Sequence, residues 1–190
     1  MESLELAKRL VTEKYSKVNE HRLLHTLGVC DMANKLAIRY NVDSIKAMIA
    51  AYMHDYCKYD SFDEIEKLLT KEEIAECREY NFLYHAYGSA YMYKKLIGDD
   101  EDIFNAIYNH VFGRPNMSIL EAIIMIADYI EINREYEDCI RCREILLKDG
   151  IDAAILYSLE NTNKYILSKN GKLHPRQIAV YEEYKMKVGK

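Results

Sequence analysis

Glycine and proline are scarce in this chain, whose 190 residues include only seven glycines and two prolines. Because these residues most often interrupt helices and strands, their scarcity favours long stretches of regular structure. Long apolar runs are also missing, and the longest, around Ala47 to Met53, is far shorter than the roughly 20 residues that cross a bilayer. The first residues, MESLELAKRL, lack the apolar centre of a signal peptide. The sequence therefore predicts no membrane span and a cytoplasmic location.

An excess of positive charge is absent as well. The 26 lysines and arginines are interspersed with 31 acidic residues, for a net charge of −5. Binding DNA or RNA through its phosphates needs a clustered basic face, so we expect no nucleic-acid partner. The five cysteines form no repeated framework, which is typical of a reducing compartment. Cys139 and Cys142 have no second cysteine pair and no nearby histidine, so we expect no redox or zinc site there.

The pattern of apolar residues is helical almost throughout. They recur at i, i+3, i+4 and i+7, as in the isoleucine-rich stretch 119–130. The sequence predicts an all-α fold, a single compact bundle over residues 1–190 with about ten short helices. Helix-start signals are the capping boxes at Ser61, Thr70 and Ser118 and the N-caps at Asn19 and Asp43. Breaks are expected near residues 17–19, 41–43, 58–61, 70, 81–83, 98–100, 112–118, 133–136, 149–151 and 169–175.

Several histidines and aspartates stand in strongly apolar surroundings. His54 and Asp55 end the apolar stretch AMIAAYM, and Asp128 lies within IIMIADYIE. A buried polar group is costly without a partner, and imidazole and carboxylate are usual ligands of zinc, iron and manganese. Each residue alone is explained more simply as a hydrogen-bonded core group. Together they supply ligands for one or two divalent ions, and the full set is His25, His54, Asp55, His85, His110 and Asp128.

These residues resemble the H…HD…D signature of the HD-domain metal-dependent phosphohydrolases, with His25, His54-Asp55 and Asp128 at the matching positions. The segments HRLLHTLGV, AAYMHDYCK, YHAYGS, HVFGRPNMS and IADYIEINR are similar to those of the YqeK-type group. That group cleaves diadenosine tetraphosphate symmetrically into two ADP. The resemblance implies an HD-type helical domain with core motifs at about 20–134 and C-terminal helices at 135–190 packing on it.

The resemblance also implies roles for individual residues. His25, His54, Asp55 and Asp128 would hold a metal ion, with iron expected first and manganese, cobalt or zinc as alternatives. The two further histidines of the set, at positions 85 and 110, would complete a second metal site or bind substrate phosphate. Nucleotide and phosphate contacts are expected for His21, Arg22, Lys58, Arg114 and Arg134.

Spacing along the chain supports cations beside the metal. Lys58 lies four residues after His54, so it returns to the metal face if the helix continues, and Arg22 precedes His25 by three residues. Arg114 precedes a capped helix start, a placement that brings its guanidinium and free backbone N–H groups towards an anion.

The expected chemistry is hydrolysis by a metal-activated water. Asp55 would take the proton of that water, and Lys58 would stabilise the phosphate charge that develops, so both are expected to be catalytic. The substrate would be diadenosine tetraphosphate and the product ADP. Two departures from the group stand out: Val111 and Phe112 replace hydroxyl residues, which weakens a direct phosphate contact, and Ile132 replaces a proline.

Two alternative functions stay open from the sequence. One is an HD-type nucleotidase that acts on mononucleotides, because H…HD…D also serves phosphomonoesterases. The other is a slow or inactive nucleotide-binding module, for which Val111 and Phe112 are the only support. The sequence is compatible with a homodimer but does not specify one.

Overall fold

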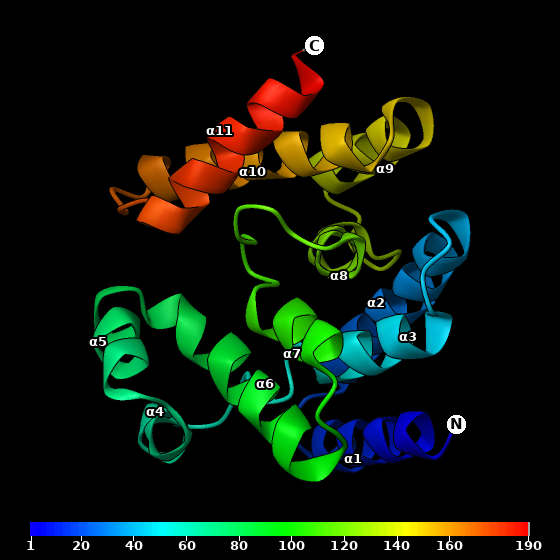
Figure 1. Ribbon diagram of the computed structural model, residues 1–190, viewed down its shortest axis with the longest axis vertical. Coiled ribbons are helices and arrows are strands. Elements are labelled where there is room, and N and C mark those ends of the chain that lie inside the picture. Colours follow the sequence, from blue (N-terminus) through cyan, green and yellow to red (C-terminus); the bar gives the residue numbers. More distant parts are fainter. Residues whose placement is uncertain (190) are drawn as a thin grey trace.

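The computed structural model describes residues 1–189, and within this range the chain is all helical, with no strand (Figure 1). The all-α prediction is therefore confirmed. The elements are α1 (Glu2–Val18), α2 (Glu20–Arg39), α3 (Ser44–Met53), α4 (Phe62–Ile65), η1 (Glu66–Leu68), α5 (Lys71–Glu79), η2 (Asn81–Leu83), α6 (Tyr84–Leu96), α7 (Glu101–Tyr108), α8 (Ile119–Ile130), α9 (Glu137–Asp149), α10 (Ile151–Ser168) and α11 (Pro175–Val188).

Helices begin where side chains can satisfy the first free backbone N–H groups. The three predicted capping boxes open α4, α5 and α8, and side-chain caps open α2 and α3 as predicted. Asp100 caps α7 in the same way, accepting from the backbone N–H of Asp102 and Ile103, and the sequence patterns did not single it out.

Helix α8 lies at the centre of the fold. In Figure 1 it is seen end-on between the C-terminal helices α9, α10 and α11 and the layer formed by α2, α3 and α7, and it packs against members of both groups. Ile123, Ile124, Ile126 and Ile130 of this helix are fully buried. Burial of each such side chain stabilises the fold by about 1.5–3 kcal/mol. Because helices on both sides hold α8 in place, the side chains that α8 presents to them have fixed positions.

The segment after α3 differs from the sequence-based expectation. Helix α3 ends at Met53, and residues 54–60 follow as successive turns, so no helix continues to Lys58. Side chains from other helices form hydrogen bonds with backbone groups that a continued helix would have paired within itself. The Tyr15 hydroxyl donates to the carbonyl of Asp55, and the N–H of Cys57 donates to the Ser89 hydroxyl at 2.9 Å.

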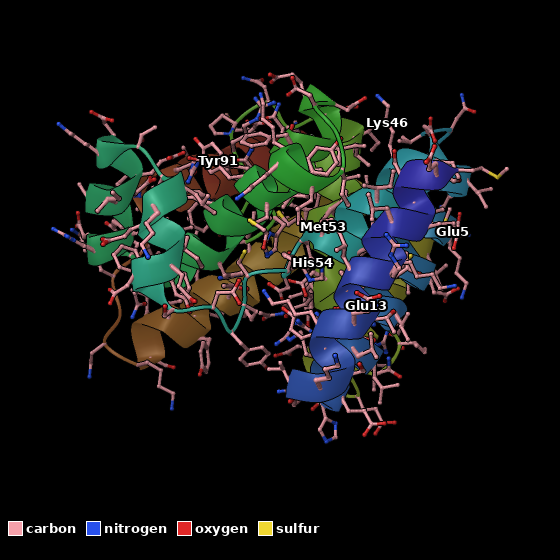
Figure 2. The ribbon with its side chains drawn as sticks, turned by 90° about the horizontal axis from the view of Figure 1, so that it is seen from below. Glu5, Glu13, Lys46, Met53, His54 and Tyr91 are labelled. Carbon is pink, nitrogen blue, oxygen red and sulfur yellow. The ribbon has the colours of Figure 1, made fainter. Side chains whose placement is uncertain are left out.

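The end of α3 lies deep in the molecule. Figure 2 shows Met53 and His54 in the middle of the protein, whereas Glu5 and Lys46 lie towards its edge. Both Met53 and His54 have no exposed surface. No helix within residues 1–189 is both long enough and apolar enough to span a membrane.

Candidate metal centre

The structure brings the six predicted ligand residues together from different elements. They come from α2, the end of α3, α6, the turn after α7, and α8. Their ligand atoms form two groups, each with its atoms within 4.8 Å of one another. The first group is His25, His54 and Asp128, and the second is Asp55, His85 and His110.

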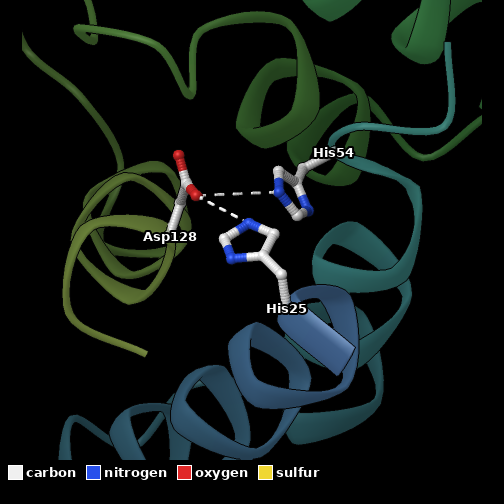
Figure 3. A group of neighbouring side chains, drawn as sticks. All are labelled: His25, His54 and Asp128. Atoms are coloured by element: carbon white, nitrogen blue, oxygen red, sulfur yellow. Dashed lines mark ion pairs between the residues drawn. The ribbon is translucent and has the colours of Figure 1, made fainter. Parts of the chain in front are cut away.

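In the first group, two imidazoles face one carboxylate (Figure 3). The Nε2 atom of His25 lies 3.1 Å from Oδ1 of Asp128, and Nε2 of His54 lies 3.9 Å from the same oxygen. His54 is fully buried, and the Asp128 side chain keeps 23% of its surface exposed. One edge of this group is therefore open to a ligand.

Asp55 lies between the two groups. Its Oδ2 atom is 3.5 Å from Nε2 of His54, and its Oδ1 atom is 3.0 Å from Nε2 of His85 and 3.6 Å from Nε2 of His110. The Asp55 side chain is only 3% exposed. This carboxylate can therefore serve one ion in each group, which is the arrangement that a paired-metal site needs.

Hydrogen bonds fix the orientation of three of the imidazoles. The Nδ1 atoms of His54 and His110 each lie 2.7 Å from a backbone carbonyl oxygen, of Ala51 and Ile107 respectively. Because a carbonyl only accepts, Nδ1 carries the proton and the Nε2 lone pair faces the cluster. Nδ1 of His25 lies 3.2 Å from a Glu131 carboxylate oxygen, which favours the same tautomer.

Atoms at the centre of the cluster lack partners of their own. Nε2 of His25, Nε2 of His54 and Oδ1 of Asp55 are buried without a hydrogen bond within residues 1–189. Buried polar atoms without partners are rare in folded proteins. A divalent cation would satisfy all three, and imidazole nitrogens with carboxylate oxygens suit zinc, iron and manganese. The residues present therefore fit a divalent metal ion.

Three cations flank the two carboxylates. Arg22 Nη1 lies 2.7 Å from Oδ2 of Asp55, and Arg134 Nη2 lies 2.8 Å from Oδ1 of Asp128. Lys58 Nζ lies 3.5 Å from Oδ1 of Asp55 and donates to Nε2 of His85 at 3.0 Å. Lys58 thus reaches the cluster through the turns after α3 instead of along a continued helix.

The protonation states of both carboxylates and of His85 suit metal binding. Burial of Asp55 by itself raises its pKa, but His54 and His85 outweigh this and hold it well below the usual range. Asp128 also has a pKa well below the usual range, because Arg134 and His25 outweigh its burial. Burial lowers the pKa of His85 to about 4, so its imidazole is neutral at pH 7. Ionised carboxylates and neutral imidazoles are the forms that ligate metals. His54 differs, because Asp55 and Asp128 outweigh its burial and raise its pKa, so a metal ion must displace a proton there.

Two of the residues predicted to contact phosphate, His21 and Arg114, lie outside the ligand cluster. His21 is exposed and lines a groove of about 500 Å³ together with Arg22, His25 and Arg134. Arg114 forms a two-pronged ion pair with Glu121, at 2.7 and 2.9 Å, beside the N-terminus of α8. No hydrogen bond or ion pair joins Arg114 to the cluster within the described chain. Its contact with phosphate requires this pair to open and stays a prediction.

Two residues of the site were missed from the sequence. Glu131, only 2% exposed, supports His25 as described above. Gly28 of α2 makes room for it, since a Cβ atom at this position would lie 2.2 Å from Glu131 Oε2. The available signal was a glycine inside a helix, one turn after His25, where glycine is otherwise unfavourable.

The sixth histidine, His174, and the cysteine pair lie outside the ligand cluster. His174 caps α11, and its Nε2 atom is 2.8 Å from a Glu76 carboxylate oxygen. Cys139 and Cys142 are buried free thiols of α9, and Cys142 donates to the Ala154 carbonyl oxygen. Burial raises the pKa of Cys142 to about 12, so this thiol stays protonated.

Comparison with known proteins agrees with this geometry. The HD domain family matches residues 22–133. "Bis(5'-nucleosyl)-tetraphosphatase, symmetrical" of Bacillus subtilis is 38% identical over 168 residues, which are 87% of this chain and 90% of the relative. The protein of the same name from Halalkalibacterium halodurans is 39% identical over 171 residues, with the same two shares.

A solved structure also matches nearly the whole chain. It is described as a predicted HD superfamily hydrolase involved in NAD metabolism, from Clostridium acetobutylicum. It is 37% identical to this chain and superposes with a TM-score of 0.83. The match covers 94% of this chain and 96% of the chain in that structure. The chain therefore belongs to the HD-domain family, in the group that contains the symmetrical bis(5'-nucleosyl)-tetraphosphatases.

Proposed function

We propose that the protein is a metal-dependent phosphohydrolase that cleaves diadenosine tetraphosphate symmetrically into two ADP. The observation that carries this proposal is the cluster of two carboxylates and four imidazoles, with unpartnered ligand atoms at its centre. Relatives that share 38–39% of its residues carry the name of this activity. A cytoplasmic location and the lack of a nucleic-acid partner belong to the same proposal, and a homodimeric assembly stays open.

His25, His54, Asp55 and Asp128 would hold the first ion in this proposal, and His85 and His110 with Asp55 would hold a second. We propose iron as the ion, as the resemblance to the YqeK-type group implies, and the nitrogen and oxygen ligands without thiolate are compatible with it. Manganese, cobalt and zinc are the alternatives. When bound, the ion supplies Lewis acidity that makes a water molecule more acidic and polarises a phosphoryl oxygen.

The proposed role of Asp55 is to take the proton from the attacking water. This role requires a site with one ion, in which Oδ2 of Asp55 faces that ion and Oδ1 stays off the metal. Oδ1 is buried without a hydrogen-bond partner within residues 1–189, so in that case it is free to accept the proton. Lys58, 3.5 Å from that oxygen, would stabilise the negative charge on the transferring phosphoryl group and on the ADP that leaves.

Two hollows adjoin the cluster and offer room for a substrate with two nucleotide halves. One is the groove beside His25, which Arg22 and Arg134 line. The other has a volume of about 330 Å³ and is lined by Lys58, His85 and other residues. Each hollow is lined by at least one cation, Arg22 and Arg134 in the first and Lys58 in the second, which suits a polyphosphate.

Product analysis tests the proposal directly. Metal-loaded protein is incubated with diadenosine tetraphosphate, and the nucleotides are separated by chromatography. We expect ADP as the only product, two for each substrate consumed. AMP together with ATP would contradict symmetric cleavage. Release of phosphate from nucleoside monophosphates would support the nucleotidase alternative, and ADP binding without turnover under iron, manganese or cobalt would support the binding module.

A further inference from the structure

The hollow beside His85 extends away from the metal ligands into apolar surroundings. Part of its lining belongs to the cluster or touches it, namely Lys58, His85, His110 and Asp128. The remaining lining residues come from η2, the turn after α7, and the C-terminal helices α10 and α11. They are Phe82, Val111, Phe112, Thr162, Tyr165, Ile166 and Gln177. One hollow therefore joins an end lined by Lys58 and candidate metal ligands to an apolar end.

Phe112 lies at the apolar end of the hollow, and its ring is packed by several neighbouring side chains. This ring is 3% exposed and packs edge-on against Phe82, with the ring centres 6.2 Å apart. The imidazole of His174 stacks on it at 5.0 Å, and the guanidinium of Arg176 lies 5.2 Å from its centre. Val111 and Phe112 cannot hydrogen-bond a phosphate. A flat apolar group such as a nucleobase fits walls of this kind.

Gln177, which lines this hollow, is a buried polar residue whose side chain makes only part of its possible hydrogen bonds. The residue has no exposed surface, and its Nε2 donates to Oδ1 of Asn163 at 2.6 Å. Its Oε1 atom is buried and has no hydrogen-bond partner within residues 1–189. Leaving such an acceptor unpaired costs about 1–3 kcal/mol. Gln177 lines the hollow, so a small movement of its side chain would let a ligand N–H donor satisfy this oxygen.

We propose that this hollow binds one nucleobase of the substrate and that Gln177 selects a base with an exocyclic amino donor. Adenine carries such a group at position 6, where hypoxanthine carries an oxygen acceptor instead. Two facing acceptors repel each other, so hypoxanthine leaves Oε1 unpaired. This assignment rests on the proposed function, and it adds Gln177 as the residue that recognises the base.

The test compares two substrates that differ in the base alone. Initial rates are measured with diadenosine and diinosine tetraphosphate, and binding of ADP and IDP to the metal-loaded protein is measured by calorimetry. Loss of one buried hydrogen bond corresponds to about a 10- to 100-fold preference for adenine, in kcat/KM and in Kd. Gln177→Met keeps the length of the side chain but removes the acceptor. It should reduce this preference to about threefold or less.

A matched control fixes the orientation of the glutamine. Asn163→Asp can only accept from Nε2 of Gln177, so Oε1 stays available to the base and the preference for adenine should persist. Circular dichroism and thermal unfolding of each variant show whether it is folded. Should Gln177→Met fail to fold, the wild-type preference and the Asn163→Asp variant still decide the question.

The outcomes separate this inference from the proposed function. Equal kcat/KM for both tetraphosphates, or a preference that survives in folded Gln177→Met, overturns the role of Gln177 while leaving the hydrolase intact. Preference of ADP over IDP that is lost in Gln177→Met, without turnover of either tetraphosphate, supports the base site and overturns the hydrolase. Absence of measurable binding and turnover contradicts both.

Discussion

Replacing Gly28 by alanine is expected to weaken metal binding without unfolding the protein. A Cβ atom at position 28 would lie 2.2 Å from Oε2 and 3.1 Å from Cδ of Glu131, and 2.8 Å from Nδ2 of Asn133. Glu131 must therefore move. In its present position it contacts Nδ1 of His25 at 3.2 Å and accepts from the N–H of Asn133 at 2.7 Å.

The magnitudes follow from these contacts. Alanine is favoured over glycine inside a helix by about 1 kcal/mol, and loss of the two Glu131 contacts costs about 1 kcal/mol each. The free energy of unfolding of the metal-free protein should therefore fall by only about 1 kcal/mol. Residues that orient a metal-bound histidine typically contribute about 10- to 100-fold to metal affinity. The Kd of the metal should rise by this factor.

Metal affinity is measured by competition with a chromophoric chelator, and stability by urea unfolding of the metal-free protein. Gly98→Ala is the matched control, because a Cβ atom there meets only the Tyr93 hydroxyl at an ordinary 3.4 Å. Glu131→Ala should reduce metal affinity as much as Gly28→Ala, and the double variant no further. A Gly28→Ala protein with wild-type metal affinity would refute the role assigned to Glu131.

Three further predictions concern separate parts of the molecule. Lys58→Ala should lower kcat by about 100- to 1,000-fold. The metal content should stay unchanged because Lys58 is not a ligand, and a lower metal content measured by atomic absorption would contradict this. Arg143→Leu removes donors to the backbone carbonyls of Ile130, Glu131 and Arg134 at the end of α8 and just after it. It should destabilise the protein by about 2–3 kcal/mol in urea unfolding, and a change below about 0.5 kcal/mol, as for a surface substitution, would contradict this. Replacing Cys139 and Cys142 together by serine should leave the metal content as it is, and reduced metal would show that this pair binds it.

Much of the fold was predictable because its signals are local. Capping boxes at Ser61, Thr70 and Ser118 lie within four residues of the helix that they open, and all three are present. The end of α3 was not predictable, since it depends on Tyr15 and Ser89, which are distant in sequence. Local patterns cannot show which distant groups will compete for a backbone N–H or carbonyl.

The sequence patterns singled out the six residues that the fold brings together, but not their arrangement. Polar residues in apolar segments indicated these candidate ligands, because buried charge needs a partner wherever the chain places it. The position of Asp55 between both groups of ligands depends on how the helices pack. The same holds for the pairing of Arg114 with Glu121, which the sequence presented as a cation available to phosphate.

The most direct test of the account is a metal titration of the metal-free protein, followed simultaneously by bound metal and by ADP formed from diadenosine tetraphosphate. The structure predicts that activity rises in proportion to bound metal and reaches its plateau at one or two ions for each chain. Asp128→Ala should lose both the bound metal and the activity. ADP formation without bound metal, or unchanged metal binding by Asp128→Ala, would contradict the central claim that this cluster is the metal centre.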